Sequence, residues 1–478
     1  MAPLIEELTP VPDPVRCCEQ LEGLPYRLFL DSAAPGPRLG RYSFVMADPV
    51  AVVRTRGDAG ALASVRQLLA PHRTESIDGL PPFQGGAAGY LAYDWGLTLE
   101  RLPAPRFDDL GLDDAVIGLY DWVLAWDHTA AKAWLISTGI PAAADRSAAR
   151  AAERAEMVKE WLSRGCRPSG LQQGGPENRS EDRQPRTDER APSYPVDGEG
   201  ALRSSFARAD YLDAVGRVRE YIYAGDIFQA NLSQRFEGPL ALPPWEFYRT
   251  LRRVNPAPFG AFFDVPGAPV LSTSPERFLR VSAGGHVETR PIKGTRARGV
   301  GPEHDAALGQ ALTESAKDRA ENLMIVDLMR NDLSRVCAPG SVRASELFAL
   351  ERYATVHHLV STVVGDLAPG HDAFDLLRAA FPGGSITGAP KLRAMEIIAE
   401  LEPSRRGVYC GSLGYWSTTG EMDTSIAIRT AVVRNGRIYF SAGGGIVADS
   451  DPEQEYRETL DKVRAIVDGL ASLRPGSE

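Results

Sequence analysis

Pro382-Gly383-Gly384-Ser385-Ile386-Thr387-Gly388-Ala389-Pro390-Lys391 is a glycine-rich turn that feeds a predicted helix. Pro390 suits the first helical turn, and Leu392, Met395 and Ile398 continue one apolar face. Free backbone N–H groups at the start of a helix attract carboxylates and phosphates. The spacing of glycine and lysine fits neither a Walker A motif nor a dinucleotide fingerprint. By itself the run is as typical of a plain tight turn as of an anion-binding loop.

Two segments upstream of this turn carry groups suited to acid and nucleophile chemistry. Glu276 follows a proline turn in Ser274-Pro275-Glu276 and is a candidate general acid. Lys293 lies in Pro291-Ile292-Lys293-Gly294-Thr295, where partial desolvation would suit it to nucleophilic use. A surface lysine in a loop is the commoner case for a lone lysine, so that alternative stays open.

The last predicted helix, downstream of the turn, offers candidate metal ligands. Its start is the segment Asp451-Pro452-Glu453-Gln454, in which Asp451 is the expected N-cap. Glu455, Glu458 and Lys462 then form one polar stripe. The stripe is either a solvated, salt-bridged face or a pair of carboxylates offered to a hard cation, with a lysine nearby for an anion.

Glu321 lies in a second predicted helix, over residues 316–328, just before a strongly apolar face. A carboxylate is costly there without a partner. It is therefore either a capped or arginine-paired core acid, or a magnesium ligand shared with the last helix.

Composition narrows the class of protein without naming a function. The chain has 478 residues, of which 43% are hydrophobic and 24% charged, and a formal net charge of −10. The acidic balance disfavours nucleic acid as the main partner, and no apolar run approaches the ~20 residues of a membrane span. The N-terminus has no secretory signal pattern, and the five scattered cysteines indicate neither a disulfide framework nor a zinc site. A large cytoplasmic enzyme, with no membrane partner, is the expectation.

Residues 167–205 are rich in turn formers and charge, and we interpret them as a flexible linker or insertion. They divide an N-terminal region, 1–166, from a C-terminal region, 206–478. Residues 115–126 and 132–137 form a predicted β-hairpin. A helix is predicted over 142–164, another through Tyr211, Val215, Val218 and Ile222, and a strand over 227–236. This mixture indicates an α+β or α/β architecture with large sheets.

From about Arg208 to the C-terminus, the motifs together resemble the chorismate-utilising enzymes. These include the large subunits of anthranilate synthase and aminodeoxychorismate synthase, and isochorismate and salicylate synthases. The N-terminal region matches more loosely. The resemblance implies an anthranilate synthase component I-like fold with large antiparallel sheets flanked by helices. The matching segments are Gly225-Asp226-Ile227-Phe228-Gln229, Ser274-Pro275-Glu276, Pro291-Ile292-Lys293-Gly294-Thr295, Glu321-Asn322-Leu323-Met324, His357-His358-Leu359-Val360-Ser361, 383–391, Tyr409-Cys410-Gly411, Ile428-Arg429-Thr430, Ala442-Gly443-Gly444-Gly445-Ile446 and 455–462.

The same resemblance implies roles for individual residues. Glu276 is similar to the general acid that protonates the departing C4 hydroxyl of chorismate. A magnesium site that binds a chorismate carboxylate is implied at Glu321 and Glu458, with Glu455 nearby. The implied substrate-binding residues are Gln229, Thr295, His358, Ser385, Tyr409, Arg429, Gly443 and Lys462.

Two positions select among the members of this family. Gln229 stands where isochorismate and salicylate synthases have a lysine that activates water, so hydroxylation at C2 is disfavoured. Lys293 stands where typical anthranilate synthases have alanine; in aminodeoxychorismate synthases the lysine is a covalent nucleophile. The implied reaction is amination of chorismate at C4 by ammonia, giving 4-amino-4-deoxychorismate for 4-aminobenzoate and folate synthesis.

The ammonia must come from elsewhere. Cys410 lacks the spaced glycines of a glutaminase nucleophile elbow, and no histidine follows His371. A separate glutaminase subunit (a class I glutamine amidotransferase) is therefore the expected partner. Two alternatives remain: anthranilate synthase component I, with Lys293 as a bystander, and a non-catalytic subunit that senses tryptophan through Leu30-Asp31-Ser32.

Overall fold

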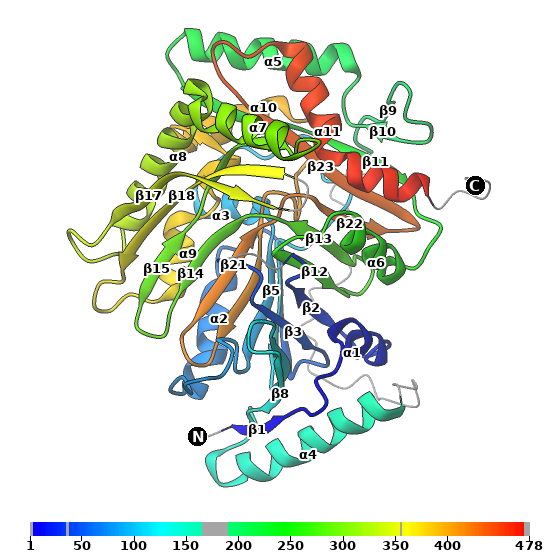
Figure 1. Ribbon diagram of the computed structural model, residues 1–478, viewed down its shortest axis with the longest axis vertical. Helices are drawn as coiled ribbons and strands as arrows, with labels where there is room; N and C mark the ends of the chain where they lie inside the picture. The colour runs from blue at the N-terminus through cyan, green and yellow to red at the C-terminus, as the bar shows by residue number, and fades with distance from the viewer. Residues whose placement is uncertain (1–2, 35–37, 165–189, 354–355, 473–478) are drawn as a thin grey trace.

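Two large antiparallel β-sheets form the body of the protein. The computed structural model describes residues 3–34, 38–164, 190–353 and 356–472. Within them, sheet A has thirteen strands and sheet B has ten. Helices cover the sheets: α5, α10 and α11 lie at the top of Figure 1 over β11 and β23, and α4 lies along the bottom beside β1. The predicted mixed fold, with large antiparallel sheets flanked by helices, is confirmed.

The elements have the following bounds. The order in sheet A is β1 (Leu4–Glu7), β8 (Lys132–Ser137), β7 (Trp122–Asp127), β3 (Tyr42–Met46), β2 (Leu28–Asp31), β12 (Phe259–Phe263), β13 (Val270–Ser274), β22 (Thr430–Arg434), β23 (Arg437–Ile446), β11 (Gln229–Pro239), β10 (Arg203–Ser204) and β9 (Tyr194–Pro195), and β19 (Gly388–Ala389) pairs with β11. The order in sheet B is β16 (Ile292–Ala297), β18 (Val356–Asp366), β15 (His286–Thr289), β14 (Arg277–Val281), β21 (Met422–Ile426), β20 (Ser412–Ser417), β5 (Gly86–Leu91), β6 (Ala115–Tyr120) and β4 (Ala51–Thr55), and β17 (Arg343–Arg352) pairs with β18. The helices are α1 (Pro14–Gln20), α2 (Ala61–Leu69), α3 (Gly96–Leu99), α4 (Ala144–Arg164), α5 (Arg208–Tyr223), α6 (Pro244–Val254), α7 (Pro302–Glu314), α8 (Ala316–Ser334), α9 (Ala373–Ala380), α10 (Lys391–Leu401) and α11 (Pro452–Ala471), with 3-10 turns η1 (Ala70–His72), η2 (Tyr93–Trp95) and η3 (Gly384–Ile386).

The N-terminal and C-terminal regions share both sheets. β2 of the first region pairs with β12 of the second, and β5 pairs in the same way with β20. Each region therefore completes the other's sheets, so the two are not separate folding units. The boundary at 167–205 stays a prediction, because residues 165–189 lie outside the described residues.

The last part of the predicted linker, residues 190–205, is ordered and is not a flexible segment. β9 and β10 extend sheet A beyond β11. Ala191, Val196 and Leu202 are buried, and Arg203 Nε donates to Ser193 Oγ at 2.8 Å. The few apolar side chains of this stretch, inconspicuous among charged neighbours, are enough to hold it against the body.

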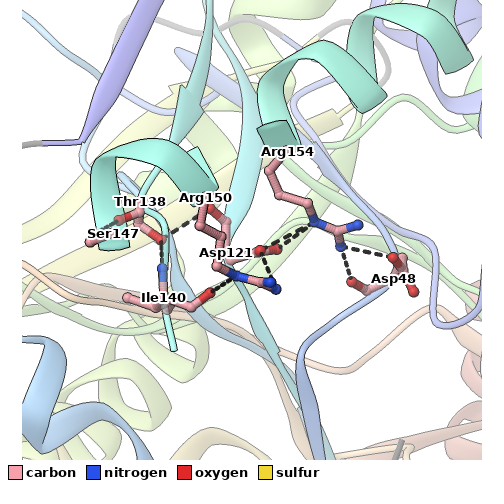
Figure 2. A network of polar contacts seen from close by, with 7 residues as sticks. All are labelled: Asp48, Asp121, Thr138, Ile140, Ser147, Arg150 and Arg154. Atoms are coloured by element: carbon pink, nitrogen blue, oxygen red, sulfur yellow. Dashed lines mark hydrogen bonds and ion pairs between the residues drawn. The ribbon is translucent and has the colours of Figure 1, made fainter. Parts of the chain in front are cut away.

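The predicted strand over 115–126 is instead two strands in different sheets, separated at Asp121. The Asp121 carboxylate is buried and accepts hydrogen bonds from Arg154 Nε at 3.2 Å and from Arg150 Nη2 at 3.4 Å (Figure 2). Arg154 also donates to the Asp48 carbonyl at 2.7 Å. The two arginines tie α4 to the point where the chain passes from sheet B to sheet A. The predicted hairpin is confirmed as β7 and β8.

The predicted starts of α8 and α11 in the C-terminal region are confirmed. α11 begins where predicted, and the Asp451 carboxylate accepts from the Gln454 N–H at 2.9 Å. α8 starts at Ala316 as predicted but continues to Ser334. Among the described residues, no helix is long and apolar enough to cross a membrane.

Candidate active site

Three consecutive glycines of β23 let polar and charged side chains approach the backbone. A Cβ at Gly445 would lie 2.7 Å from Gln229 Nε2 and 3.1 Å from Lys293 Nζ. A Cβ at Gly444 would lie 2.8 Å from Glu455 Oε2. Successive residues of a strand face opposite sides. The glycine segment is thus closely approached on both faces, and larger residues would displace the groups gathered there.

Gln229 is the first residue of β11 and is fully buried. Neither its amide oxygen nor its amide nitrogen has a hydrogen-bond partner among the described residues. Lys293, on the edge strand β16, has its ammonium group beside the same glycine. A buried amide that lacks partners costs free energy, so a bound polar ligand would satisfy it.

Glu276 is buried where the chain turns into β14. Burial raises the pKa of Glu276 from an ordinary 4.5 to about 7, although a hydrogen bond with the Ser385 side chain, the charge of Lys293 and a hydrogen bond with the Ile292 backbone all lower it. A large fraction of this carboxyl is therefore protonated at neutral pH. Such a group can act as a general acid.

The predicted turn at 382–391 contains η3 and the short strand β19, and α10 starts only at Lys391. Pro390 is the N-cap of α10 and not its first helical residue. Ser385 lies in η3 and is buried with its side chain at Glu276. The turn thus carries a contact to the candidate acid.

His358 lies on β18, one strand from Lys293. Its Nδ1 hydrogen-bonds with Thr295 Oγ1 at 2.8 Å. Burial, reinforced by the charges of Arg429 and His357, lowers the pKa of His358 to about 3. The imidazole is neutral at pH 7, so it is a hydrogen-bonding group there and not a cation.

Arg429 lies between β21 and β22, and Tyr409 lies in the loop that precedes β20. Burial lowers the pKa of Arg429, and within the described ranges its guanidinium has no carboxylate or hydrogen-bond partner. Tyr409 is buried, and its ring lies 5.9 Å from Cζ of Arg406. A buried cation without a counter-ion is suited to an anionic substrate.

Three carboxylates lie on the helix side of the site. Burial raises the pKa of Glu321 overall. The positive charge of Lys293 partly opposes this shift, and the negative charge of Glu458 adds to it. Burial also raises the pKa of Glu455, which accepts from Ser450 Oγ at 2.7 Å. Like charges that interact in this way favour a shared cation.

Lys462 forms part of this acidic group. Its Nζ lies 2.6 Å from Glu458 Oε1 and donates to the Gly443 carbonyl at 2.7 Å. Burial raises the pKa of Glu458, but the charge and hydrogen bond of Lys462, with the charges of Lys293 and Lys317, lower that pKa overall. In the part of the chain that the structure describes, no three acidic, histidine or cysteine side chains lie close enough to hold a metal as they stand. Carboxylate oxygens are suitable ligands for Mg²⁺. To bind the ion, Glu458 would have to break its ion pair with Lys462.

Sequence reasoning missed a buried ion pair behind the site, Glu402 with Arg406. The two are four residues apart in a segment that resembles an exposed loop. Their i,i+4 spacing was the one available signal. Asn322, within the Glu321-Asn322-Leu323-Met324 motif, is fully buried. It accepts from Ser361 Oγ and donates to the Leu359 carbonyl on β18.

The fold and the site together define a chorismate-binding enzyme. The sequence model of the family "chorismate binding enzyme" matches residues 26–468, so the chain belongs to this family.

Within the family, the chain is 42% identical to aminodeoxychorismate synthase component 1 of Salmonella typhimurium, over 94% of this chain and 93% of that one. It is 41% identical to anthranilate synthase component 1 of Cereibacter sphaeroides, over 91% and 87%. A solved structure of anthranilate synthase component I from Streptococcus pneumoniae TIGR4 matches with a TM-score of 0.72 and 30% identity, over 89% and 92%. Relatives with the two names have nearly the same sequence identity to this chain, so overall identity does not distinguish between the two activities.

Proposed function

We propose that this enzyme aminates chorismate at C4 to give 4-amino-4-deoxychorismate, with Lys293 as a covalent nucleophile. The observation that carries the proposal is the position of Lys293: its ammonium group lies beside the unpaired Gln229 amide and within electrostatic reach of the buried acid Glu276. By the family resemblance, typical anthranilate synthases have alanine at this position, and alanine cannot act as a nucleophile.

The proposed reaction has two balanced steps. The neutral amine of Lys293 attacks C2, the ring double bonds shift, and the C4 hydroxyl leaves as water with the proton of Glu276. Ammonia then adds at C4, the double bonds shift back, and the Lys293–C2 bond breaks with the neutral lysine amine as the leaving group. The new C4 ammonium group returns one proton to the Glu276 carboxylate, which regenerates the acid. The enolpyruvyl group is retained throughout, and chorismate plus ammonia become aminodeoxychorismate plus water.

Gln229 disfavours hydroxylation of chorismate at C2. An amide does not accept a proton from water at neutral pH, so it cannot activate water as a base. Its two unpaired polar atoms can instead hydrogen-bond a substrate hydroxyl or carboxylate. Arg429, which has no counter-ion in the described ranges, supplies positive charge for one of the two carboxylates of chorismate.

Mg²⁺ is the proposed cofactor, held by Glu321, Glu455 and Glu458, where it would supply positive charge to a substrate carboxylate. We expect chelation to abolish turnover and Mg²⁺ to restore it. Glu458→Gln should raise the Mg²⁺ concentration for half-maximal binding, measured by calorimetry, at least about tenfold. The matched control is Glu453→Gln, on the same helix, because Glu453 pairs with Arg208 and Arg457 instead. Equal Mg²⁺ affinity in both variants would contradict the assignment.

A glutaminase subunit is the proposed source of ammonia. Burial raises the pKa of Cys410 to about 12, so its thiol is a poor nucleophile. The other cysteines of the described residues, Cys17, Cys18 and Cys337, are likewise buried and free. None of these four is suited to glutamine hydrolysis, and we expect the chain alone to use ammonium salts but not glutamine.

Product analysis tests the proposed function. The purified chain is incubated with chorismate, Mg²⁺ and ammonium, and the products are separated with and without added aminodeoxychorismate lyase. We expect no fluorescent anthranilate, and 4-aminobenzoate only when the lyase is present. Anthranilate in the absence of lyase would identify the rival activity, and no chorismate consumption at high ammonium would favour a non-catalytic subunit.

A further inference from the structure

The guanidinium of Arg406 is buried next to the segments that carry Ser385 and Gln229. It belongs to the loop between α10 and β20, and its side chain is 2% exposed. Nε donates to Glu402 Oε2 at 2.9 Å, and Nη2 donates to Glu402 Oε1 at 2.7 Å. Glu402 Oε1 also accepts from the backbone N–H and hydroxyl of Ser233, both at 2.8 Å. The pair is therefore bidentate and linked to β11.

The remaining donors of Arg406 reach two segments that carry site residues. Nη1 donates to the carbonyl of Ile386 at 2.9 Å, directly after Ser385. Nη2 donates to the carbonyl of Asn231 at 2.6 Å, two residues after Gln229 on β11. The planar fork thus joins the η3 turn to the strand that begins at Gln229.

Two aromatic rings complete the surroundings of this guanidinium. Its Cζ lies 4.5 Å from the centre of the Tyr93 ring and 5.9 Å from that of Tyr409. Tyr93 belongs to the N-terminal region, and its N–H donates to the Gly407 carbonyl at 2.9 Å. One side chain therefore contacts Glu402, η3, β11, Tyr93 and Tyr409.

A buried ion pair is a poor source of stability, because desolvation of both charges offsets their attraction. An apolar pair of similar volume often folds as stably. What an apolar pair lacks is the fixed fork of donors that holds several carbonyls in one geometry. The use of arginine at this position is better explained by the geometry it fixes than by stability.

We infer that Arg406 is a positioning residue for the amination reaction: it holds the Ser385 turn against β11, so that the Ser385 hydroxyl stays bonded to Glu276. The inference rests on the proposed function only for the role of Glu276 as the acid. Ser385 stabilises the ionised form of Glu276. If the turn moves, that stabilisation is lost, and the acid titrates at higher pH.

The test is the pH profile of kcat/KM for chorismate consumption at constant free ammonia. Arg406→Lys keeps the charge but not the fork of donors. We expect kcat/KM to fall about 10²-fold, as for a misplacement of about 1 Å. We also expect the alkaline limb to move up by about one pH unit, the equivalent of one hydrogen bond to a charged group.

The matched control is Arg154→Lys. Arg154 is also buried, bonded to carboxylates and to a backbone carbonyl, but lies on α4 at the far end of the molecule (Figures 1 and 2). It should lower stability and leave the alkaline limb in place. Ser385→Ala should shift the limb as Arg406→Lys does, and the double variant should shift it no further.

Two outcomes would overturn the inference: a folded Arg406→Lys enzyme with the wild-type limb, or a limb shift shared by Arg154→Lys. If Arg406→Lys does not fold, Glu402→Gln provides the same comparison. We expect it to shift the alkaline limb in the same direction by a smaller amount, and an unmoved limb would contradict the role of Arg406. The limb is recorded whichever aminated product forms. An anthranilate product would therefore contradict the proposed function but not the role of Arg406. An unmoved limb would contradict the role of Arg406 but not the proposed function.

Discussion

Lys293→Ala is expected to slow formation of aminodeoxychorismate by at least about 10³-fold, as for the loss of other catalytic nucleophiles. The variant should retain its fold, because Lys293 lies on the edge strand of sheet B and has no hydrogen bond or ion pair among the described side chains. It should also retain binding of chorismate and Mg²⁺, since Arg429 and the carboxylates of α8 and α11 are unchanged. Product chromatography with added lyase measures the loss.

Lys293→Arg separates the charge of the lysine from its nucleophilicity. A guanidinium keeps positive charge near Glu276 but stays protonated and does not attack C2. We therefore expect Lys293→Arg to be as inactive as Lys293→Ala. Recovery of activity in the arginine variant would reduce Lys293 to an electrostatic role.

Direct detection of the intermediate completes this test. Without ammonia, the wild-type enzyme and chorismate should accumulate an adduct with the mass of chorismate less one water, on the peptide that contains Lys293. The adduct should be absent from both variants and disappear on addition of ammonium. Wild-type turnover with no adduct under any condition would count against the covalent route.

The predicted site residues lie in compact sequence motifs, and their roles stay predictions. Glu276, Lys293 and Ser385 lie in three separate segments, yet the structure joins them through one carboxyl group. The start of α11 was predictable from its N-cap and proline alone. The stripe Glu455, Glu458 and Lys462 follows from helical spacing. In the structure Glu458 forms a salt bridge with Lys462, whereas Glu455 is buried.

What the sequence did not reveal depends on contacts between distant segments. The run 115–126 has uniform β propensity, and its division at Asp121 depends on Arg150 and Arg154, about thirty residues away. Sheet sharing between the two regions is equally non-local. The role of Arg406 was not predictable from the sequence for the same reason. Its side chain donates hydrogen bonds to the carbonyls of Asn231 and Ile386, which are distant in sequence.

Glu276→Gln is expected to lower kcat/KM by about 10²- to 10⁴-fold, the range for loss of a general acid. In the wild type, only the protonated carboxyl can release the C4 hydroxyl as water. Because the pKa of Glu276 is raised to about 7, kcat/KM at constant free ammonia should fall about tenfold per pH unit above that value. The variant should lose this alkaline limb. A limb that persists in Glu276→Gln would assign the titration to another group.

Glu276→Gln should lower activity but, as pH rises above 4.5, raise the free energy of unfolding relative to the wild type. Since the pKa of Glu276 is higher in the folded state than the ordinary 4.5, the folded protein binds more protons between pH 4.5 and 7, and the wild type loses stability as pH rises through that window. The loss amounts to about 3 kcal/mol at most. Glu276→Gln, which cannot ionise, should therefore gain stability relative to the wild type as pH rises from 4.5 to 8, measured by denaturant unfolding at both pH values. A relative stability that did not change with pH would mean that Glu276 is not strained by its burial, and would remove the physical basis for its role as the acid.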